Sequence, residues 1–155
     1  MKPVKLHSGA AKQRGLAMVE FTIVLPLLLL LMLATAEFGR ALFQYNTLTK
    51  AVRDGARYWS SNAYSGSGTE ENNAARTAAR NLVLCGKTTC ADGDALLPGM
   101  TLDKVTAAFS GIDHVTMSAQ YAYQPILGPV LPTFGLGSNI SLNFTLSATV
   151  TMRVI

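Results

Sequence analysis

The chain has 155 residues, of which 49% are hydrophobic and 14% are charged, and its formal net charge is +4. This composition excludes a disordered chain, and the length suits one small domain with or without an anchor. Four of the 13 basic residues and no acidic residue fall in the first fifteen positions, so the other nine basic residues balance the nine acidic ones. The excess charge therefore lies in an N-terminal leader, and a basic face for nucleic acid is not indicated.

The first predicted element is a membrane-spanning helix over residues 16–36, in which Glu20 is the only charged residue. At about 1.5 Å per residue, this run covers the hydrocarbon core of a bilayer, which is about 30 Å thick. The basic leader, residues 1–15, predicts that the N-terminus stays in the cytoplasm and that residues 37–155 are exported.

Two cleavage sites compete at the ends of this apolar run. Ala34-Thr35-Ala36 is a small-x-small site, where signal peptidase would release a soluble chain that begins at Glu37. Cleavage after Gly15 would instead keep the anchor and place Glu20 one helical turn from a new amino terminus on Leu16. We favour cleavage after Gly15, because a carboxylate inside a plain signal sequence costs insertion energy and has no purpose there.

An ordered set of motifs extends from Arg14 to Arg57. It reads Arg-Gly-x-x-x-Val-Glu-Phe from position 14, Val-Leu-Pro-Leu-Leu from 24, Glu-Phe-Gly-Arg from 37 and Arg-x-Gly-Ala-Arg from 53. Tyr-x-Tyr-x-Pro-Ile-Leu over 121–127 and the run over 146–153 agree with it. Together these segments resemble the TadE-like family of minor pilins, or pseudopilins, of tight-adherence (Flp) pilus systems.

The resemblance implies a membrane-anchored prepilin with a structural, non-catalytic role in pilus assembly. A prepilin peptidase would cut between Gly15 and Leu16, and Glu20, followed by Phe21, would be the assembly carboxylate. The implied partners are this peptidase, other Flp or Tad pilins and assembly proteins, and the bilayer of the bacterial inner membrane. No cofactor, metal, nucleic acid or small-molecule substrate is expected. The alternatives are a secreted binding module cut after Ala36 and an uncleaved single-pass tether.

Helical periodicity continues beyond the anchor. Residues spaced three and four apart form one mostly apolar stripe: Phe38, Leu42, Tyr45, Thr49, Val52, Ala56 and Trp59. This stripe predicts that the outer half of the helix packs on the exported domain.

A second helix is predicted from about residues 67–69 to Leu84, since Ser67 and Glu70 have capping-box spacing. Its two arginines, Arg76 and Arg80, are expected on a solvated face.

Cys85 and Cys90 predict a small structural disulfide in the exported domain. Two cysteines do not complete a zinc site, which needs four ligands, and a redox pair usually has two intervening residues rather than four. Closing so short a loop should contribute about 2 kcal/mol.

Strict alternation of apolar and polar residues predicts antiparallel strands over 114–124 and 140–154, with a third near 105–109. The predicted fold class is α+β, a long N-terminal helix that continues into an amphipathic helix packed on a small antiparallel sheet. Between the strands, residues 125–132 are apolar but contain three prolines, which excludes a regular strand interior. This segment is either a loop tucked over the core or an exposed apolar surface for a partner or the membrane.

Overall fold

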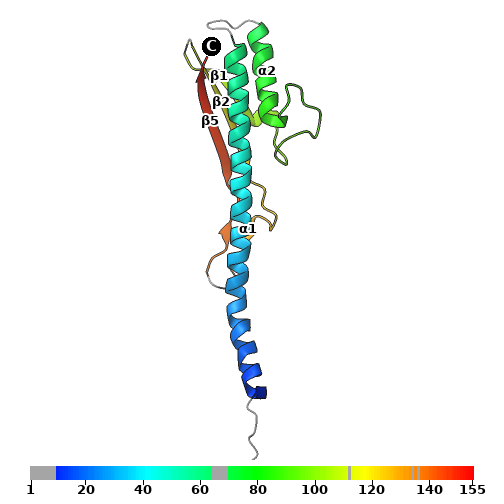
Figure 1. Cartoon of the computed structure of the whole chain (residues 1–155), viewed down its shortest axis with the longest axis vertical. Coiled ribbons are helices and arrows are strands. Elements are labelled where there is room, and N and C mark those ends of the chain that lie inside the picture. The colour runs from blue at the N-terminus through cyan, green and yellow to red at the C-terminus, as the bar shows by residue number, and fades with distance from the viewer. Residues whose placement is uncertain (1–9, 64–69, 112, 134, 136) are drawn as a thin grey trace, which may run out of the picture.

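The computed structural model describes residues 10–63, 70–111, 113–133, 135 and 137–155. One long helix, α1 (Ala10–Asn62), forms the axis of the molecule, and the rest of the chain packs along its C-terminal half (Figure 1). Its 53 residues correspond to about 80 Å at 1.5 Å per residue. The helix extends beyond the predicted residues 16–59 at both ends, and it continues through Pro26.

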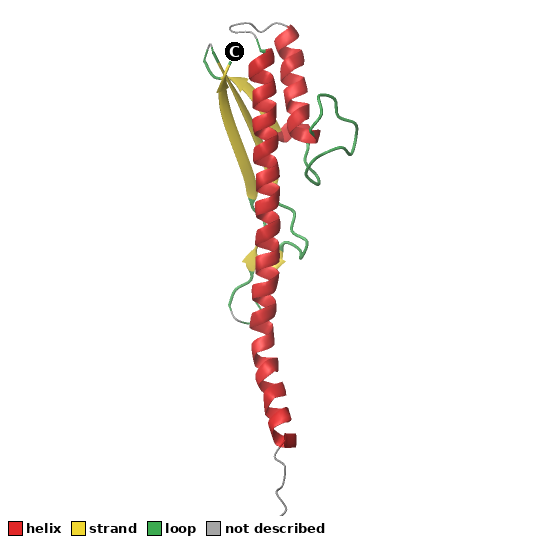
Figure 2. Ribbon diagram, in the orientation of Figure 1, coloured by secondary structure: helices red, strands yellow, loops and turns green. Residues whose placement is uncertain are grey.

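The second helix, α2 (Glu70–Cys85), lies beside the C-terminal part of α1 (Figure 2). A loop and the short 3-10 helix η1 (Leu102–Lys104) then lead to the strands. The predicted capping residue Ser67 lies outside the described residues.

Three antiparallel strands form the main sheet in the order β1 (Val105–Phe109), β2 (His114–Ala122) and β5 (Thr145–Arg153). Val105 pairs with Ala119, and His114 pairs with Arg153. A separate two-stranded sheet, β3 (Val130–Leu131) with β4 (Ile140–Ser141), lies beside α1 on the N-terminal side of the main sheet (Figure 1). The predicted α+β fold class, with a long helix on a small antiparallel sheet, is confirmed.

The prediction of one strand over 140–154 is wrong in one respect, because the strand is divided. The N–H of Leu142 donates to Pro129 O at 2.9 Å, whereas the N–H of Tyr123 donates to Phe144 O at 2.9 Å. The chain thus exchanges its hydrogen-bond partner between residues 142 and 144. The side-chain alternation continues through this exchange, so the sequence pattern carries no sign of it.

The core lies between the C-terminal half of α1, α2 and one face of the main sheet. Its fully buried large side chains are Leu48, Val52, Trp59, Val83, Val105, Val115 and Met117. Gly55 on α1 faces Ala79 and Val83 on α2, and this small residue lets the two helices approach closely.

The predicted apolar stripe packs on the domain only in its second half. Val52, Ala56 and Trp59 are buried, but Phe38 and Leu42 are exposed, Phe38 by 66%. Tyr45 is exposed as well, and the buried face of α1 below Leu48 instead carries Glu37 and Gln44. Glu37 is buried because this part of α1 meets a loop segment with hydrogen-bond donors, whereas the buried Gln44 Oε1 has no hydrogen-bond partner among the described residues.

The expectation of a solvated face holds for Arg76 but is wrong for Arg80, which is partly buried. Its guanidinium donates from Nε to Val105 O at 2.9 Å and from Nη2 to Leu102 O at 2.7 Å. Arg80 therefore ties α2 to the start of β1.

Candidate membrane anchor and assembly segment

The N-terminal half of α1 presents an apolar surface that no other part of the described chain covers. Its large hydrophobic side chains from Leu16 to Met32 are mostly exposed, and they include Met18, Val19, Phe21, Ile23, Leu27, Leu28 and Leu31. Among the described residues, α1 is the one helix that is long and apolar enough to cross a membrane. This property is consistent with a single-pass anchor or a signal sequence.

The residues of the expected cleavage site lie on α1 without a break in the helix. A Cβ atom added to Gly15 would meet nothing within 4 Å, so packing within the chain does not require glycine there. Leu16, Glu20 and Phe21 are exposed. The structure gives the Glu20 carboxylate no hydrogen bond or ion pair with any residue it describes. The fold of the single chain therefore does not explain the identity of Gly15 or Glu20.

A second carboxylate, Glu37, lies where α1 meets the loop after β2, and it is only 5% exposed. Its Oε1 accepts hydrogen bonds from the backbone N–H groups of Ile126 at 3.0 Å and Leu127 at 2.9 Å. Its Oε2 accepts a short hydrogen bond from the hydroxyl of Tyr123. The Tyr123 ring stacks on Phe144 with a centroid separation of 4.7 Å. Glu37 thus joins the helix to a segment almost ninety residues later in the chain.

The electrostatics of this pair follow from its hydrogen bonds. Burial acts to raise the pKa of Glu37, but the donors Tyr123, Leu127 and Ile126, with the nearby Arg40, outweigh it and hold the pKa below its ordinary value. Burial, together with the hydrogen bond to Glu37, raises the pKa of Tyr123 to about 12. Glu37 is therefore ionised and Tyr123 is neutral at physiological pH.

The segment that Glu37 holds is here named the foot, residues 125–133 and 137–144. Of its apolar side chains, Ile126, Leu127, Val130 and Ile140 are exposed, Ile126 by 72%, whereas Leu131 is buried. A cleft of about 220 Å³ separates the foot from α1. Ala34, Phe38 and Ala41 line it from the helix, and Leu131, Ile140, Leu142 and Phe144 line it from the foot. The exposed apolar surface, one of the two interpretations of residues 125–132, is the one observed.

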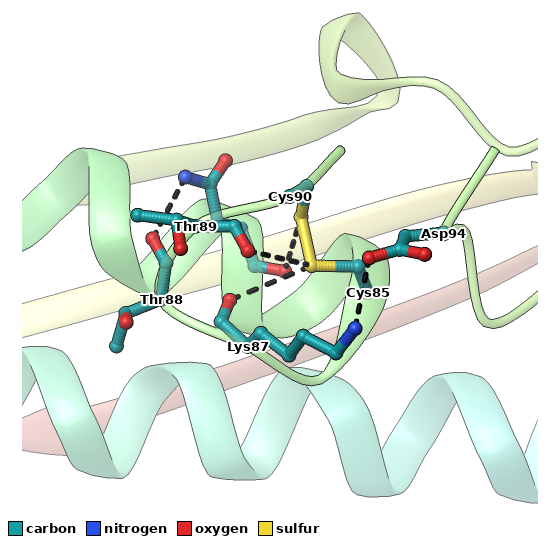
Figure 3. The surroundings of a disulfide bond; sticks show 7 residues. Cys85, Lys87, Thr88, Thr89, Cys90 and Asp94 are labelled. Atoms are coloured by element: carbon teal, nitrogen blue, oxygen red, sulfur yellow. Dashed lines mark hydrogen bonds and ion pairs between the residues drawn. A yellow bond between two sulfur atoms is a disulfide. The ribbon is translucent and has the colours of Figure 1, made fainter. Parts of the chain in front are cut away.

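The disulfide between Cys85 and Cys90 is present at the C-terminal end of α2 (Figure 3). Lys87 Nζ lies 2.9 Å from Asp94 Oδ2, and this contact lowers the pKa of the Asp94 carboxyl. Asn81 Nδ2 donates to Thr88 O at 2.9 Å. These contacts hold a short loop against the C-terminal end of α2, which is the end that lies nearer to the middle of α1 (Figure 1).

Replacing both Cys85 and Cys90 with serine should lower the free energy of unfolding by about 2 kcal/mol, since the bridge restricts a short loop of the unfolded chain. Chemical denaturation of the full chain in detergent, followed by the fluorescence of Trp59, measures this loss. Lys87→Ala is the control, because it removes only an exposed ion pair and should leave stability nearly unchanged. Equal stability of the serine variant and the wild type would contradict a structural role for the bridge.

The described residues offer no candidate site for a metal ion. Within residues 10–63, 70–111 and the described part of 113–155, no group of three or more His, Cys, Asp or Glu side chains is placed to hold a metal ion. The described residues form a long apolar helix, a loop that Glu37 holds to this helix, and a small α+β domain with one disulfide.

The fold combines a long apolar N-terminal helix with a small α+β domain that packs on the C-terminal half of this helix. The family model described as TadE-like protein matches residues 15–57, from the glycine of the expected cleavage site to the buried part of α1. These residues are a TadE-like domain, as the sequence motifs predict, and the match implies a pilin-like protein associated with a Tad pilus. No curated protein and no solved structure matches the chain.

Glu37 and Tyr123 belong to the sequence motifs at 37–40 and 121–127, but these motifs indicate no role for either residue. The position of Glu37 was the available indication, since it directly follows an apolar run and a charge that becomes buried there needs a hydrogen-bond partner. Its partners lie 86 to 90 residues later, and two of the three are backbone groups, which a side-chain pattern does not reveal.

Proposed function

We propose that the chain is a membrane-anchored minor pilin, or pseudopilin, that takes part in assembly of a tight-adherence (Flp) pilus. A prepilin peptidase removes residues 1–15 on the cytoplasmic side. Residues 16–36 then hold the protein in the bacterial inner membrane, with the domain over 37–155 in the periplasm or outside the cell. The role is structural and non-catalytic, and the partners are the peptidase, other Flp or Tad pilins and assembly proteins.

The observation that carries this proposal is the TadE-like match, which begins at Gly15 and contains both the cleavage segment and the anchor. The geometry supports it in two ways. The apolar surface of α1 over residues 16–32 remains available to lipid or to neighbouring helices. Within the part of the chain that is described, Glu20 has no hydrogen bond or ion pair and Gly15 has no neighbour that requires glycine, which supports roles toward a peptidase or another subunit.

In this proposal the Glu20 carboxylate pairs with the amino group of Leu16, either its own after cleavage or that of a neighbouring subunit. The pairing neutralises both charges within the membrane, where an isolated charge is costly. Phe21, which follows Glu20, contributes apolar surface to the same helix packing.

Release of a soluble module by cleavage after Ala36 is the alternative function. We favour the anchored protein over this alternative, because that cut would remove Ala34 from the wall of the cleft and place a new chain terminus directly at Glu37, which holds the foot. The anchored protein keeps both features.

The N-terminal sequence and intact mass of the protein from its native membranes test the proposal. We expect a chain that begins at Leu16. Gly15→Val should leave the leader attached while export continues, because the bulky side chain blocks the peptidase, and Glu20→Leu should impair assembly or maturation.

The matched controls are bulky substitutions at Ala34 and Ala36, which should change neither the N-terminal residue, Leu16, nor the location of the mature chain. A soluble chain that begins at Glu37, and that is lost in these control variants, would refute the pilin proposal and establish the secreted module.

A further inference from the structure

The foot lies at the level where the expected membrane span ends. Residues 16–36 extend about 31 Å along α1, which matches the hydrocarbon core of a bilayer. Ile126 and Leu127 donate to Glu37, the next residue on the helix, within 3.0 Å. Ala34, which belongs to the span itself, shares a cleft with Leu131 of the foot. In the anchored protein the surroundings of this cleft are therefore lipid and headgroups rather than bulk water.

The chemistry of the foot fits that level. Residues 115–152 contain no Asp, Glu, Lys, Arg or His, a run that includes the entire foot. Three of its residues, Pro125, Pro129 and Pro132, have no backbone N–H that would need a partner away from water. The Glu37 carboxylate is buried and accepts three hydrogen bonds, so it presents little charge to the surroundings.

The part of the domain beyond the foot has the opposite character. Exposed charged residues gather on the outer part of α1, on α2 and on the loops that follow it: Arg53, Asp54, Arg57, Arg76, Lys87, Asp92, Asp94, Asp103 and Lys104. The exposed charges of these residues thus lie away from the foot, which itself contains no charged residue. An apolar patch next to a membrane span, continuous with the exposed apolar surface of the span, marks a surface for lipid.

We propose that the foot rests in the outer interfacial layer of the bilayer that holds the anchor, with Ile126, Leu127, Val130 and Ile140 among the acyl chains and a lipid chain in the cleft against α1. The foot fixes the height and tilt of the exported domain relative to the membrane. This inference rests on the proposed membrane anchoring of the protein.

Depth-dependent quenching of tryptophan fluorescence by brominated lipids tests this proposal. The full chain carries the substitution Ile126→Trp and is reconstituted in phosphatidylethanolamine–phosphatidylglycerol vesicles, with or without bromine on the acyl chains. Trp59, the single native tryptophan, is fully buried in the remote part of the domain and serves as the internal reference. Thr88→Trp, in the exposed disulfide loop, is the matched control.

We expect the added emission of Ile126→Trp to be shifted to the blue and quenched several-fold more strongly than that of Thr88→Trp. Val130→Trp should behave in the same way, so the result does not depend on the folding of one variant. The quenching should stay constant when the protein is diluted in lipid.

Three results would overturn the proposal. If the added tryptophans at 126 and 130 emit as in water and are not quenched, the foot is solvated although the anchor is inserted. If the quenching by lipid rises as the protein is diluted, a second copy rather than lipid covers the foot. If the wild type does not float with vesicles, anchoring itself fails, and this result separates failure of the proposed function from failure of the inference alone.

Discussion

Replacing Glu37 with alanine should release the foot from α1 while the three-stranded sheet stays folded. The change leaves two backbone N–H groups without their acceptor, and it leaves the Tyr123 hydroxyl only its 3.2 Å hydrogen bond to Glu37 O. An unsatisfied buried group costs about 1–3 kcal/mol, and some donors will reach water, so we expect a local loss of about 3 kcal/mol. Faster hydrogen exchange at the amides of Ile126 and Leu127 measures this loss directly.

Proteolysis gives a second measurement, since residues 115–152 contain no lysine or arginine. Chymotrypsin should cut the foot of Glu37→Ala much faster than that of the wild type, whereas trypsin should not cut it in either protein. Asp54→Ala removes an exposed carboxylate from the same helix and is the control. If Glu37→Ala protects the two amides as well as Asp54→Ala does, the carboxylate does not hold the foot.

The same contact predicts a pH dependence. The pKa of Glu37 is lower in the folded protein than its ordinary value of 4.5, so the ionised form favours folding. This contribution is fully present above pH 4.5 and is lost as the pH falls through the folded pKa. Two further carboxylates, Asp94 and Asp103, which unlike Glu37 are exposed, also have lowered pKa values. The difference between the wild type and Glu37→Gln isolates the part that belongs to Glu37, and this difference should shrink in acid.

Much of the fold follows from patterns that act over short distances in the sequence. Apolar run length predicts the N-terminal half of α1, and alternation predicts β2 and β5, because both patterns reflect which side chains share a face. The cysteine pair likewise predicts its own bridge, since only five positions separate Cys85 from Cys90. In each case the residues that decide the structure are neighbours along the chain.

The errors arise where a distant segment decides which face is buried. Below Leu48, α1 buries Glu37 rather than Phe38, because the segment that meets it offers N–H and hydroxyl donors to the Glu37 carboxylate. Periodicity locates an apolar stripe but does not state what opposes it. Phe38 and Leu42 remain exposed, as do Ile126, Leu127, Val130 and Ile140 of the foot, so much of the apolar surface at this level lies outside the core.

The predicted cleavage segment and the contact between Glu37 and the foot differ in how far the sequence indicates them. Gly15 and Glu20 are identified by their position at the start of an apolar run, which is a local property. The tie between Glu37 and the foot depends on contacts across 86 to 90 positions, and two of its donors are backbone groups. The prediction that Arg80 is solvated is wrong for the same reason, since both acceptors that it binds at the start of β1 are backbone carbonyls.

Gly55 is the position where one added methyl group should disturb the core most. A Cβ atom there would lie 2.5 Å from Val83 Cγ2 and 2.8 Å from Ala79 O. The valine side chain has other rotamers, but the carbonyl belongs to the backbone of α2, so the two helices would have to separate. Overpacking of this kind costs about 1–3 kcal/mol, and we expect Gly55→Ala at the upper end of that range.

Gly39→Ala is the matched control on the same helix, because a Cβ atom there meets nothing within 4 Å. Alanine is favoured over glycine in a helix by about 1 kcal/mol, so this variant should be more stable than the wild type. Chemical denaturation followed by Trp59, which is buried in the same core, measures both changes. A loss of stability in Gly55→Ala together with a gain in Gly39→Ala would establish that the close contact of α1 with α2 at Gly55 orients the domain on α1. A gain in stability at both positions would mean that the helices are not in close contact at Gly55, and that α1 is held to the domain by its packing on the sheet and by the foot.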